Sequence, residues 1–398
     1  MKRKIRLSIV LVAFSVAVFG GCAAYDDFAA TFFEEDEETV KIGVFEPMSG
    51  AFARYGELER AGIELARELY PELDGKPVQL IFADNESLIK RASSAAQELV
   101  DRDVLIVLGS YDSTLSIAGG EVFQEAGVPA ISITNTNPVV TDAFAVYCRV
   151  CPLTAEQGAA AAAYAADNLR ADKVAVIKEK DNDPADALAR NFADTFTAKT
   201  GNGAGAVLIA EYEKGQKDFA KQLEKIEAFD AEAVFCPGSW EMGAGVMTQA
   251  GFMGLKTEFL GTDAWRTTRM LNMYKSGEMP PMAFTTYFNE SARMTEMSTV
   301  FIEAYEKKYG TDVAPDPAVA LAFDAYLVAL ESIRTADPST ERSEILKALR
   351  ETEAFAGASG EITFDDRGDP IKPITISSVM DGKFVSLDSV KLEKEKGN

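Results

Sequence analysis

The stretch DVLIVLGSYDST, residues 103–114, sets the architecture expected for the whole chain, because an apolar run passes directly into a polar loop. The run Val104–Leu108 has no polar residue to alternate with, which is typical of a strand buried on both faces. The loop holds Ser113 and Thr114, and a helical segment follows it as far as Ala126. A buried strand followed by a polar loop and a helix is the unit of a parallel α/β sheet.

The same unit repeats along the chain, and the series restarts after about residue 157. The expected strands are 41–48, 77–85, 104–110, 128–134, 173–179, 204–212, 231–239 and 257–263, with further strands and turns in 361–387. The expected helices are 56–70, 88–101, 157–169, 186–200, 219–229, 297–309, 318–335 and 343–351. Two such series predict an α/β protein with two doubly wound parallel-sheet lobes.

Composition excludes several classes of protein. The 398 residues are enough for two domains, and 47% hydrophobic content supports buried cores. A net charge of −23 argues against nucleic acid and anionic membrane surfaces as partners. The chain has no histidine, which rules out Ser-His-Asp and Cys-His catalysis and histidine zinc sites. No P-loop or GxGxxG motif is present, so we expect no cofactor.

The N-terminus has the pattern of an export signal. Basic residues within 2–6 precede the apolar segment Leu7–Phe19, which is too short to span a membrane comfortably. Two glycines then precede Cys22, which resembles the lipobox of bacterial lipoproteins. We therefore expect a signal peptide at 1–21, a lipid on Cys22 and an acidic tether over 22–39, with simple secretion as the alternative. In either case we expect the protein to be extracytoplasmic, at the periplasm or outer cell surface.

The candidate binding site lies in the loops after the strands, because open α/β sheets bind ligands beyond the carboxyl ends of their strands. These loops are 47–55, 110–114, 134–137, 180–183, 237–241 and 262–266. Ser113 either caps the helix that follows it or helps to bind an anion, since a helix start suits both roles. Both tryptophans, Trp240 and Trp265, fall in these loops and favour an aromatic lining for a pocket.

Five blocks of sequence resemble the branched-chain amino-acid binding proteins, type I periplasmic solute-binding proteins that serve ABC transporters. They are GVFEPMSGAFARYGELERAGIELA, ADNES, DVLIVLGSYDST, VPAISITNTNP and FLGTDAW. The resemblance implies two lobes that close on a ligand and three crossover segments, near 149–152, 282–288 and 365–373. It also implies that residues 40–149 and 289–364 form lobe 1, and that residues 150–288 and 365–390 form lobe 2.

The resemblance also assigns ligand-binding positions. They are Tyr55, Ser113, Thr114, Thr134, Thr136 and Asp263. Ser113 and Thr114 match the residues that hold the ligand α-carboxylate. Thr134 and Thr136 match a loop whose carbonyl and hydroxyl groups share the carboxylate and the ammonium, and Asp263 matches the acid that pairs with the ammonium. A zwitterion that loses its water in a closed cleft needs both partners.

Two positions depart from the family pattern. Relatives carry tyrosines where this chain has Asp181–Asp183 and Ser239-Trp240. We count Asp183 as a candidate contact for a basic or polar ligand side chain, and Trp240 as a residue that narrows the pocket or stacks on an aromatic group. The expected ligand is an amino acid; the alternative is a small aromatic carboxylate or amide.

The cysteines give a weaker signal. Cys148 and Cys151 have the CxxC spacing, which in a thioredoxin-like setting indicates redox chemistry. Here a proline follows, and strand residues three apart point to opposite faces, which disfavours a local bridge. The sequence leaves a free buried thiol and a structural bridge open, and Cys236 is expected to be buried.

Three functions compete for this sequence. The resemblance favours a substrate-binding lipoprotein that is not an enzyme and whose partners are a small ligand and the permease subunits of an ABC transporter. It would contact the membrane only through its lipid. A ligand sensor that reports to a separate receptor is the second hypothesis. An enzyme ranks last, because no nucleophile–base pair is visible among the acids of the strand-end loops.

Overall fold

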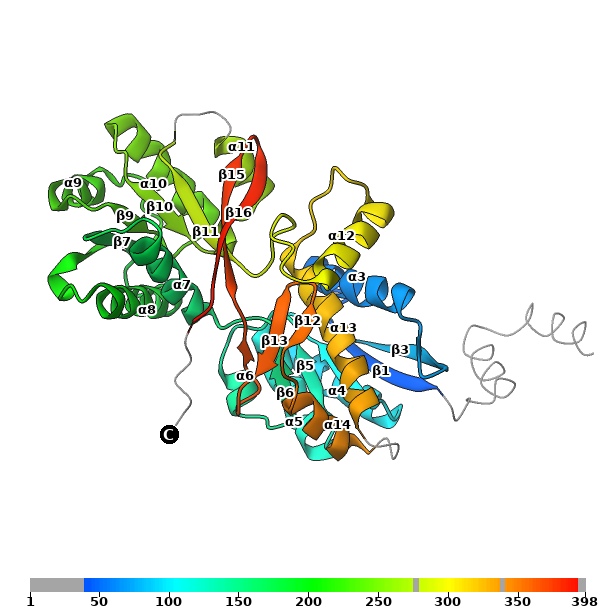
Figure 1. The fold of residues 1–398 in the computed structure, drawn as a ribbon. Coiled ribbons are helices and arrows are strands. Elements are labelled where there is room, and N and C mark those ends of the chain that lie inside the picture. Colours follow the sequence, from blue (N-terminus) through cyan, green and yellow to red (C-terminus); the bar gives the residue numbers. More distant parts are fainter. Residues whose placement is uncertain (1–38, 275–278, 337–340, 393–398) are drawn as a thin grey trace, which may run out of the picture.

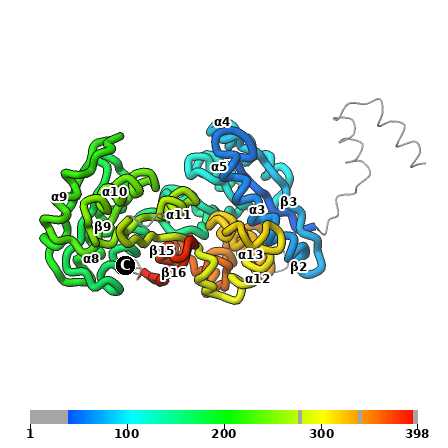
Figure 2. Tube along the Cα trace, turned by 90° about the horizontal axis from the view of Figure 1, so that it is seen from above, coloured from blue at the N-terminus to red at the C-terminus, as the bar shows by residue number. Residues whose placement is uncertain are grey.

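The computed structural model describes residues 39–274, 279–336 and 341–392, so residues 1–38, with Cys22 and the predicted signal peptide, lie outside it. The described chain forms two α/β lobes, each with helices on both faces of a central sheet (Figure 1). Viewed along a perpendicular direction, the lobes lie side by side (Figure 2). The predicted fold class, α/β with two lobes, is confirmed, although the sheets are mixed and mostly parallel.

Lobe 1 is built on a six-stranded sheet of order β2-β3-β1-β4-β5-β6. Its strands are β1 (Val40–Glu46), β2 (Glu72–Leu73), β3 (Lys76–Asp84), β4 (Ile106–Gly109), β5 (Ala130–Ser132) and β6 (Tyr147–Arg149). Its helices are α3 (Ala53–Leu69), α4 (Ile89–Asp101), α5 (Ser113–Ala126) and the short α6 (Val139–Asp142). Strand β1 pairs in parallel with β3 and β4, and its apolar residues are buried, as the unbroken run predicted.

Three later helices also pack around lobe 1. They are α12 (Glu296–Tyr309), α13 (Pro317–Thr335) and α14 (Arg342–Arg350). Helix α13 is apolar around most of its circumference and lies in the same core as β1 and α3. Gly62 of α3 permits this close packing, because a Cβ there would collide with the Val319 carbonyl. The chain therefore returns to lobe 1 after it has passed through lobe 2.

Lobe 2 is built on a seven-stranded sheet of order β16-β15-β11-β10-β9-β7-β8. Its strands are β7 (Val174–Glu179), β8 (Val207–Tyr212), β9 (Ala233–Phe235), β10 (Glu258–Gly261), β11 (Met282–Thr286), β15 (Ile374–Met380) and β16 (Lys383–Val390). Its helices are α7 (Thr154–Asp167), α8 (Asp183–Thr200), α9 (Ala220–Phe229), α10 (Trp240–Met253) and α11 (Thr268–Tyr274), with 3-10 turns at Ala204–Ala206 and Asp263–Trp265. Two cores, one on each face of the sheet, support the lobe.

Neither sheet is wholly parallel, which differs from the prediction. Strands β15 and β16 are antiparallel, because they are joined by the tight turn Asp381-Gly382, whose residues both have positive φ. The turn Asp74-Gly75 joins β2 to β3 in the same way. A two-residue turn leaves no length for the crossover that parallel strands require.

The chain passes between the two large sheets three times, after β6, after β11 and before β15. The segment predicted near 282–288 begins as β11 of the lobe 2 sheet, so the chain leaves that sheet only after Thr286. Strands β12 (Phe355–Gly357), β13 (Gly360–Phe364) and β14 (Pro370–Ile371) form a small separate sheet. The predicted division between 364 and 365 therefore falls between two paired strands of this sheet.

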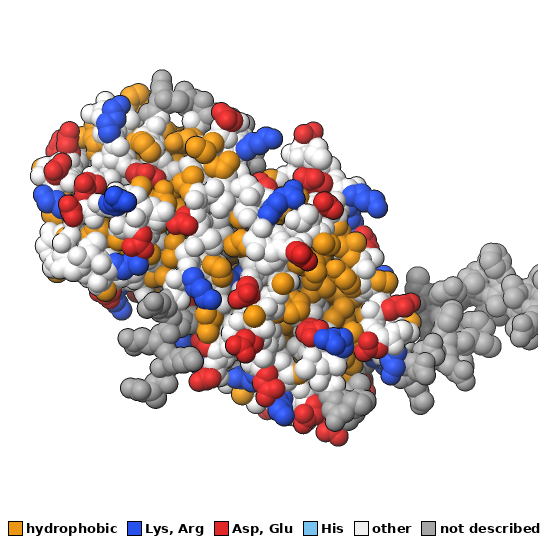
Figure 3. All heavy atoms as spheres, viewed as in Figure 1, with side chains coloured by type: hydrophobic (Ala, Val, Ile, Leu, Met, Phe, Trp, Pro, Cys, Tyr) orange, Lys and Arg blue, Asp and Glu red, His pale blue; other side chains and the backbone are white. Residues whose placement is uncertain are grey.

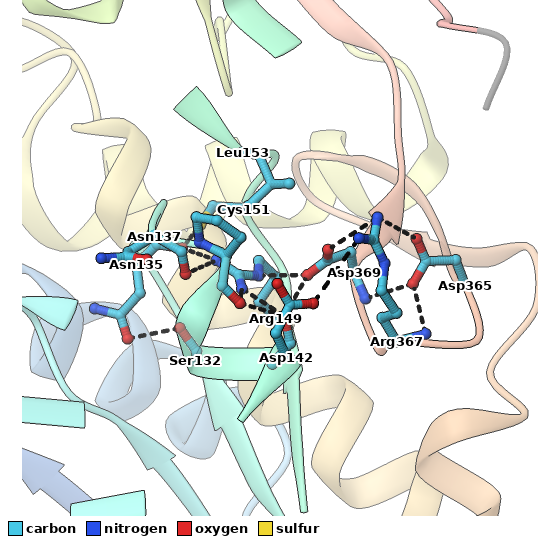
Figure 4. A network of polar contacts seen from close by, with 12 residues as sticks. Ser132, Asn135, Asn137, Asp142, Arg149, Cys151, Leu153, Asp365, Arg367 and Asp369 are labelled. Atoms are coloured by element: carbon cyan, nitrogen blue, oxygen red, sulfur yellow. Dashed lines mark hydrogen bonds and ion pairs between the residues drawn. The ribbon is translucent and has the colours of Figure 1, made fainter. Parts of the chain in front are cut away.

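The first and third connections meet at Arg149, which has no exposed surface. Its Nε lies 2.6 Å from Asp369 Oδ1, and its Nη1 donates to the carbonyls of Asn135 and Asn137 at 2.9 Å (Figure 4). Thr141 accepts a further bond from Nη2 and donates to Asp369. One buried cation thus fixes a strand-end loop of lobe 1 to the third connecting segment.

On the face shown in Figure 3, acidic and basic side chains are scattered over both lobes, and the residues drawn in colour form no continuous basic surface. Within residues 39–274, 279–336 and 341–392, no helix has the length and apolar character needed to cross a membrane.

Replacing Arg149 with methionine should lower the free energy of unfolding by about 3–5 kcal/mol, because Asp369 would stay buried without its cation. Urea unfolding curves measure this loss. Arg334→Met is the matched control, since it breaks the exposed pair with Glu331 and should change little. Equal destabilisation by both changes would refute the structural role given to Arg149.

Candidate functional site

A cavity of about 410 Å³ lies where the strand-end loops of the two lobes meet. It is lined by Tyr55, Leu58, Tyr111, Thr134, Thr136, Thr154, Gln157, Leu188, Thr262, Asp263, Arg266, Tyr287, Asp316, Pro317, Ala318 and Leu321. Four of the predicted site residues belong to this lining, namely Tyr55, Thr134, Thr136 and Asp263. The structure therefore brings together segments that lie far apart in sequence, from Tyr55 to Leu321.

An aromatic pair forms one wall of the cavity. The rings of Tyr55 and Tyr111 stack with centroids 4.5 Å apart and planes 6° from parallel. Burial raises the pKa of Tyr111 to about 12, so its phenol stays neutral. Tyr55 was predicted; Tyr111 was not, although it lies in a strand-end loop as Tyr55 does. The pair offers a flat surface to an apolar or aromatic part of a ligand.

Gln157 of α7 holds Asp263 in place. Its Nε2 donates to Asp263 Oδ1 at 2.9 Å, and its Oε1 accepts the backbone N–H of Asp263 at 3.0 Å. The same amide bonds the hydroxyls of Thr285 (2.6 Å) and Tyr287 (2.7 Å). Burial raises the pKa of the Asp263 carboxyl, while the Gln157 bond opposes that rise. Nothing in the sequence marks Gln157, a glutamine within a helix.

A second acid, Asp316, lines the same cavity from lobe 1. It caps α13, because its Oδ1 accepts the backbone N–H of Ala318 at 2.9 Å. Its negative charge contributes to the raised pKa of Asp263. Arg266 is the basic residue of the lining, and its Nη2 lies 2.7 Å from Glu290 Oε2. The two acids and the one paired cation leave the cavity negative in balance.

The loop after β5 presents two threonines in different ways. The Thr134 hydroxyl donates to the carboxyl of Glu59, a fully buried residue of α3. The half-buried Thr136 also faces the cavity, and none of the described residues bonds its hydroxyl. Arg149 holds the carbonyls on either side of Thr136, so this loop is fixed before any ligand arrives.

The start of α5 differs from the expectation for Ser113. The N-cap is Asp112, whose Oδ1 accepts the backbone N–H groups of Thr114 (2.9 Å) and Leu115 (3.3 Å). Ser113 is therefore the first residue of the helix and not its cap. Ser113 and Thr114 follow the lining residue Tyr111 closely in sequence, but they are not part of the cavity lining. An aspartate caps better here because its carboxylate reaches two unpaired N–H groups.

Asp183 and Trp240 also lie outside the cavity lining. Asp183 is the exposed first residue of α8, whose cap is Asn182. Trp240 begins α10 and lies 5.7 Å from the Arg269 guanidinium. The interpretation of Trp265 as a pocket residue was wrong: it is fully buried, because its ring fills the space beside Gly243 and Gly261.

A second hollow, of about 650 Å³, opens in lobe 2 at the ends of β7, β8 and β9. Its lining includes Glu179, Asn182, Tyr212, Ser239 and Glu241. Two of the predicted strand-end loops, 180–183 and 237–241, thus contribute to this hollow and not to the cavity between the lobes.

The three described cysteines, Cys148, Cys151 and Cys236, are free and buried. Burial raises the pKa of Cys148 and of Cys151 to about 12, so both remain thiols. Cys151 donates its S–H to the carbonyl of Asn135. Of the two states left open by the sequence, the free buried thiol is the one found.

Comparison with known proteins adds independent findings. A family model described as periplasmic binding protein matches residues 39–383. The chain is 34% identical over 230 residues to an amino acid binding protein of Pseudomonas aeruginosa, a match that covers 56% of this chain and 60% of that protein. It is 26% identical over 385 residues to Leu/Ile/Val-binding protein homolog 3 of Brucella melitensis, covering 95% and 98%. A crystallised leucine-binding protein of Thermotoga maritima shares 31% identity and a TM-score of 0.70, covering 88% and 99%.

Proposed function

The chain belongs to the periplasmic binding protein family, as its sequence blocks indicated, and we propose from this premise that it captures a zwitterionic amino acid for an ABC transporter. One observation carries the proposal: an acid of lobe 2, Asp263, and the hydroxyl-bearing loop of lobe 1 line one cavity. Members of this family are binding proteins, and we propose that the ligand leaves unchanged.

The ligand ammonium is assigned to Asp263. Gln157 positions this carboxylate. Burial disfavours its negative charge, and a bound ammonium would compensate for that cost. Asp316 adds a lobe 1 carboxylate to the same cavity, which favours the cationic end of the ligand there. The Tyr55–Tyr111 pair would cover the side chain of the amino acid.

The ligand carboxylate is assigned to the hydroxyls of Thr136, Ser113 and Thr114. Among the described residues, none bonds the hydroxyl of Ser113 or Thr136, so both are available as donors. Asp112 already occupies two N–H groups at the start of α5, so side-chain hydroxyls and not the helix end supply the donors. With its carboxylate on lobe 1 and its ammonium on Asp263 of lobe 2, the ligand contacts both lobes and so has a reason to draw them together.

The moving bodies are proposed to be residues 40–149 with 289–364, and residues 150–288 with 365–390. The family places the protein outside the cytoplasm. We propose that lipid on Cys22 anchors it to the membrane and that permease subunits receive its ligand. Release of a Cys22→Ala variant into the soluble fraction tests the anchor; an unchanged membrane fraction would rule it out.

A small aromatic carboxylate is the second candidate ligand. The stacked tyrosines favour a flat ring in the cavity, while the two cavity acids disfavour a ligand without a cation. The two ligand classes therefore differ in whether Asp263 is needed.

A thermal-shift screen against amino acids, aromatic carboxylates and amides identifies the class. An amino acid at a hundred times its Kd should stabilise the protein by about 2.7 kcal/mol, because only the folded state binds it. Benzoate serves as the probe for the alternative class. A shift with benzoate and with no amino acid would reject the amino-acid proposal.

The change Asp263→Asn should weaken binding of the amino acid by about 3–5 kcal/mol, the scale for removing one partner of a buried ion pair. Isothermal titration calorimetry measures the Kd. Asp218→Asn is the control, since this exposed acid of lobe 2 accepts the backbone N–H of Ala220 at the start of α9 and asparagine can accept it equally well. An unchanged Kd for Asp263→Asn would remove this residue from the site.

A further inference from the structure

Two glutamates lie in contact beneath the cavity with no exposed surface. Glu46 ends β1 and Glu59 belongs to α3, and their carboxyl groups are neighbours that perturb each other's pKa. No ion pair joins either carboxyl to a lysine or arginine within the described part of the chain. Two buried carboxyl groups in contact without a cation must hold at least one proton, because two adjacent buried charges of one sign repel strongly.

Each of these carboxyl groups also holds a loop of the cavity. Glu46 Oε2 accepts the backbone N–H of Tyr111 at 3.0 Å, and Glu59 Oε1 accepts the Thr134 hydroxyl. The remaining oxygens, Oε1 of Glu46 and Oε2 of Glu59, are buried and accept no hydrogen bond from the described residues. A single proton between these two oxygens satisfies both, since a buried polar atom needs a hydrogen-bond partner.

We propose that the proton content of the Glu46–Glu59 pair sets what Thr134 presents to the ligand, and that the amino acid binds the form with one shared proton. This rests on the function proposed above. In that form Thr134 donates its hydroxyl hydrogen to Glu59 and turns oxygen lone pairs toward the cavity, where an ammonium requires acceptors. Glu59 is thus a positioning residue for the ammonium.

A second proton reverses this arrangement. The second proton goes to Glu59 Oε1. Of the other three carboxyl oxygens, Glu46 Oε2 already accepts the Tyr111 N–H, and the remaining two share the first proton. Glu59 then donates to Thr134, and the Thr134 hydroxyl hydrogen is left to face the cavity. The pair also loses its negative charge. When the ammonium binds to protein that carries the second proton, that proton passes from Glu59 to solvent. No other covalent bond is made or broken.

The groups near the pair are neutral or negative, apart from Arg149, whose charge is already paired. Tyr111 and Tyr147 are phenols whose pKa burial raises, and Cys151 is a thiol whose pKa is raised to about 12. Asp316 is the nearby carboxylate from α13, and it raises the pKa of Glu59 further. On β6, the cation Arg149 is already bonded to Asp369.

Burial raises the pKa of Glu59 to about 7, so the second proton is exchanged in the neutral range. The ammonium and carboxylate of a free amino acid do not titrate there. Asp263 also has a raised pKa and could add a pH dependence of its own. Variants of Glu59 separate the two sources, because they leave Asp263 untouched.

The experiment compares the Kd of the strongest amino acid of the screen at about pH 5.5 and about pH 8 by calorimetry. The wild-type protein should bind about thirtyfold more weakly at the lower pH, since release of one proton from a group of pKa about 7 contributes up to tenfold per pH unit below that pKa. Glu59→Gln should bind equally at both, because its amide donates to Glu46 and accepts from Thr134, as the singly protonated pair does. Glu57→Gln, an exposed position on the same helix, should follow the wild type.

A wild-type pH dependence retained in Glu59→Gln would overturn the proposal. No binding of any amino acid at about pH 8 would instead reject the proposed function.

Thermal unfolding then tests the pair without ligand. Because the folded state binds the Glu59 proton more tightly than the unfolded chain, stability should fall as the pH rises from about 5 to about 8 in wild type and Glu57→Gln. Glu59→Gln should lack this part of the fall, and parallel curves would overturn the proposal.

Discussion

The buried guanidinium of Arg149 is the constraint on which the binding site depends. It has no exposed surface, so each of its donors must find a partner inside the protein. The partners it finds are Asp369 of the third connection and the carbonyls of Asn135 and Asn137. The threonine loop of the cavity is therefore tied to the segment about which the lobes are joined. A loop held this way already has its binding groups in place. The conformational entropy of ordering the loop is lost on folding and not on ligand binding.

The chemistry of the cavity follows from what lies behind its walls. Asp263 is oriented by Gln157, an amide that also bonds two hydroxyls of lobe 2. Thr134 is oriented by Glu59, one half of a buried carboxyl pair. In both lobes a buried residue thus determines how another lining residue faces the ligand. Under the proposed function, this is how a cavity with several acids would distinguish the two ends of a zwitterion.

The sequence predicted the features that depend on local pattern. Unbroken apolar runs such as Val104–Leu108 predicted buried parallel strands, and the strand-end rule located Tyr55, Thr134, Thr136 and Asp263 at one cavity. Features that depend on distant partners were missed. Gln157 looks like any polar helix residue, and its role exists only because α7 lies beside Asp263.

Two further misses have clear physical causes. Trp265 was placed in the pocket because it follows a strand, but two glycines leave space for its ring in the core. Asp316 reads as an ordinary helix cap, and only the return of α13 to lobe 1 brings it to the cavity.

Closure of the lobes over a zwitterion is tested most directly by small-angle X-ray scattering. The radius of gyration should fall when wild-type protein is saturated with its amino acid and stay constant in Asp263→Asn. An unchanged radius in saturated wild-type protein would show that the ligand does not draw the lobes together.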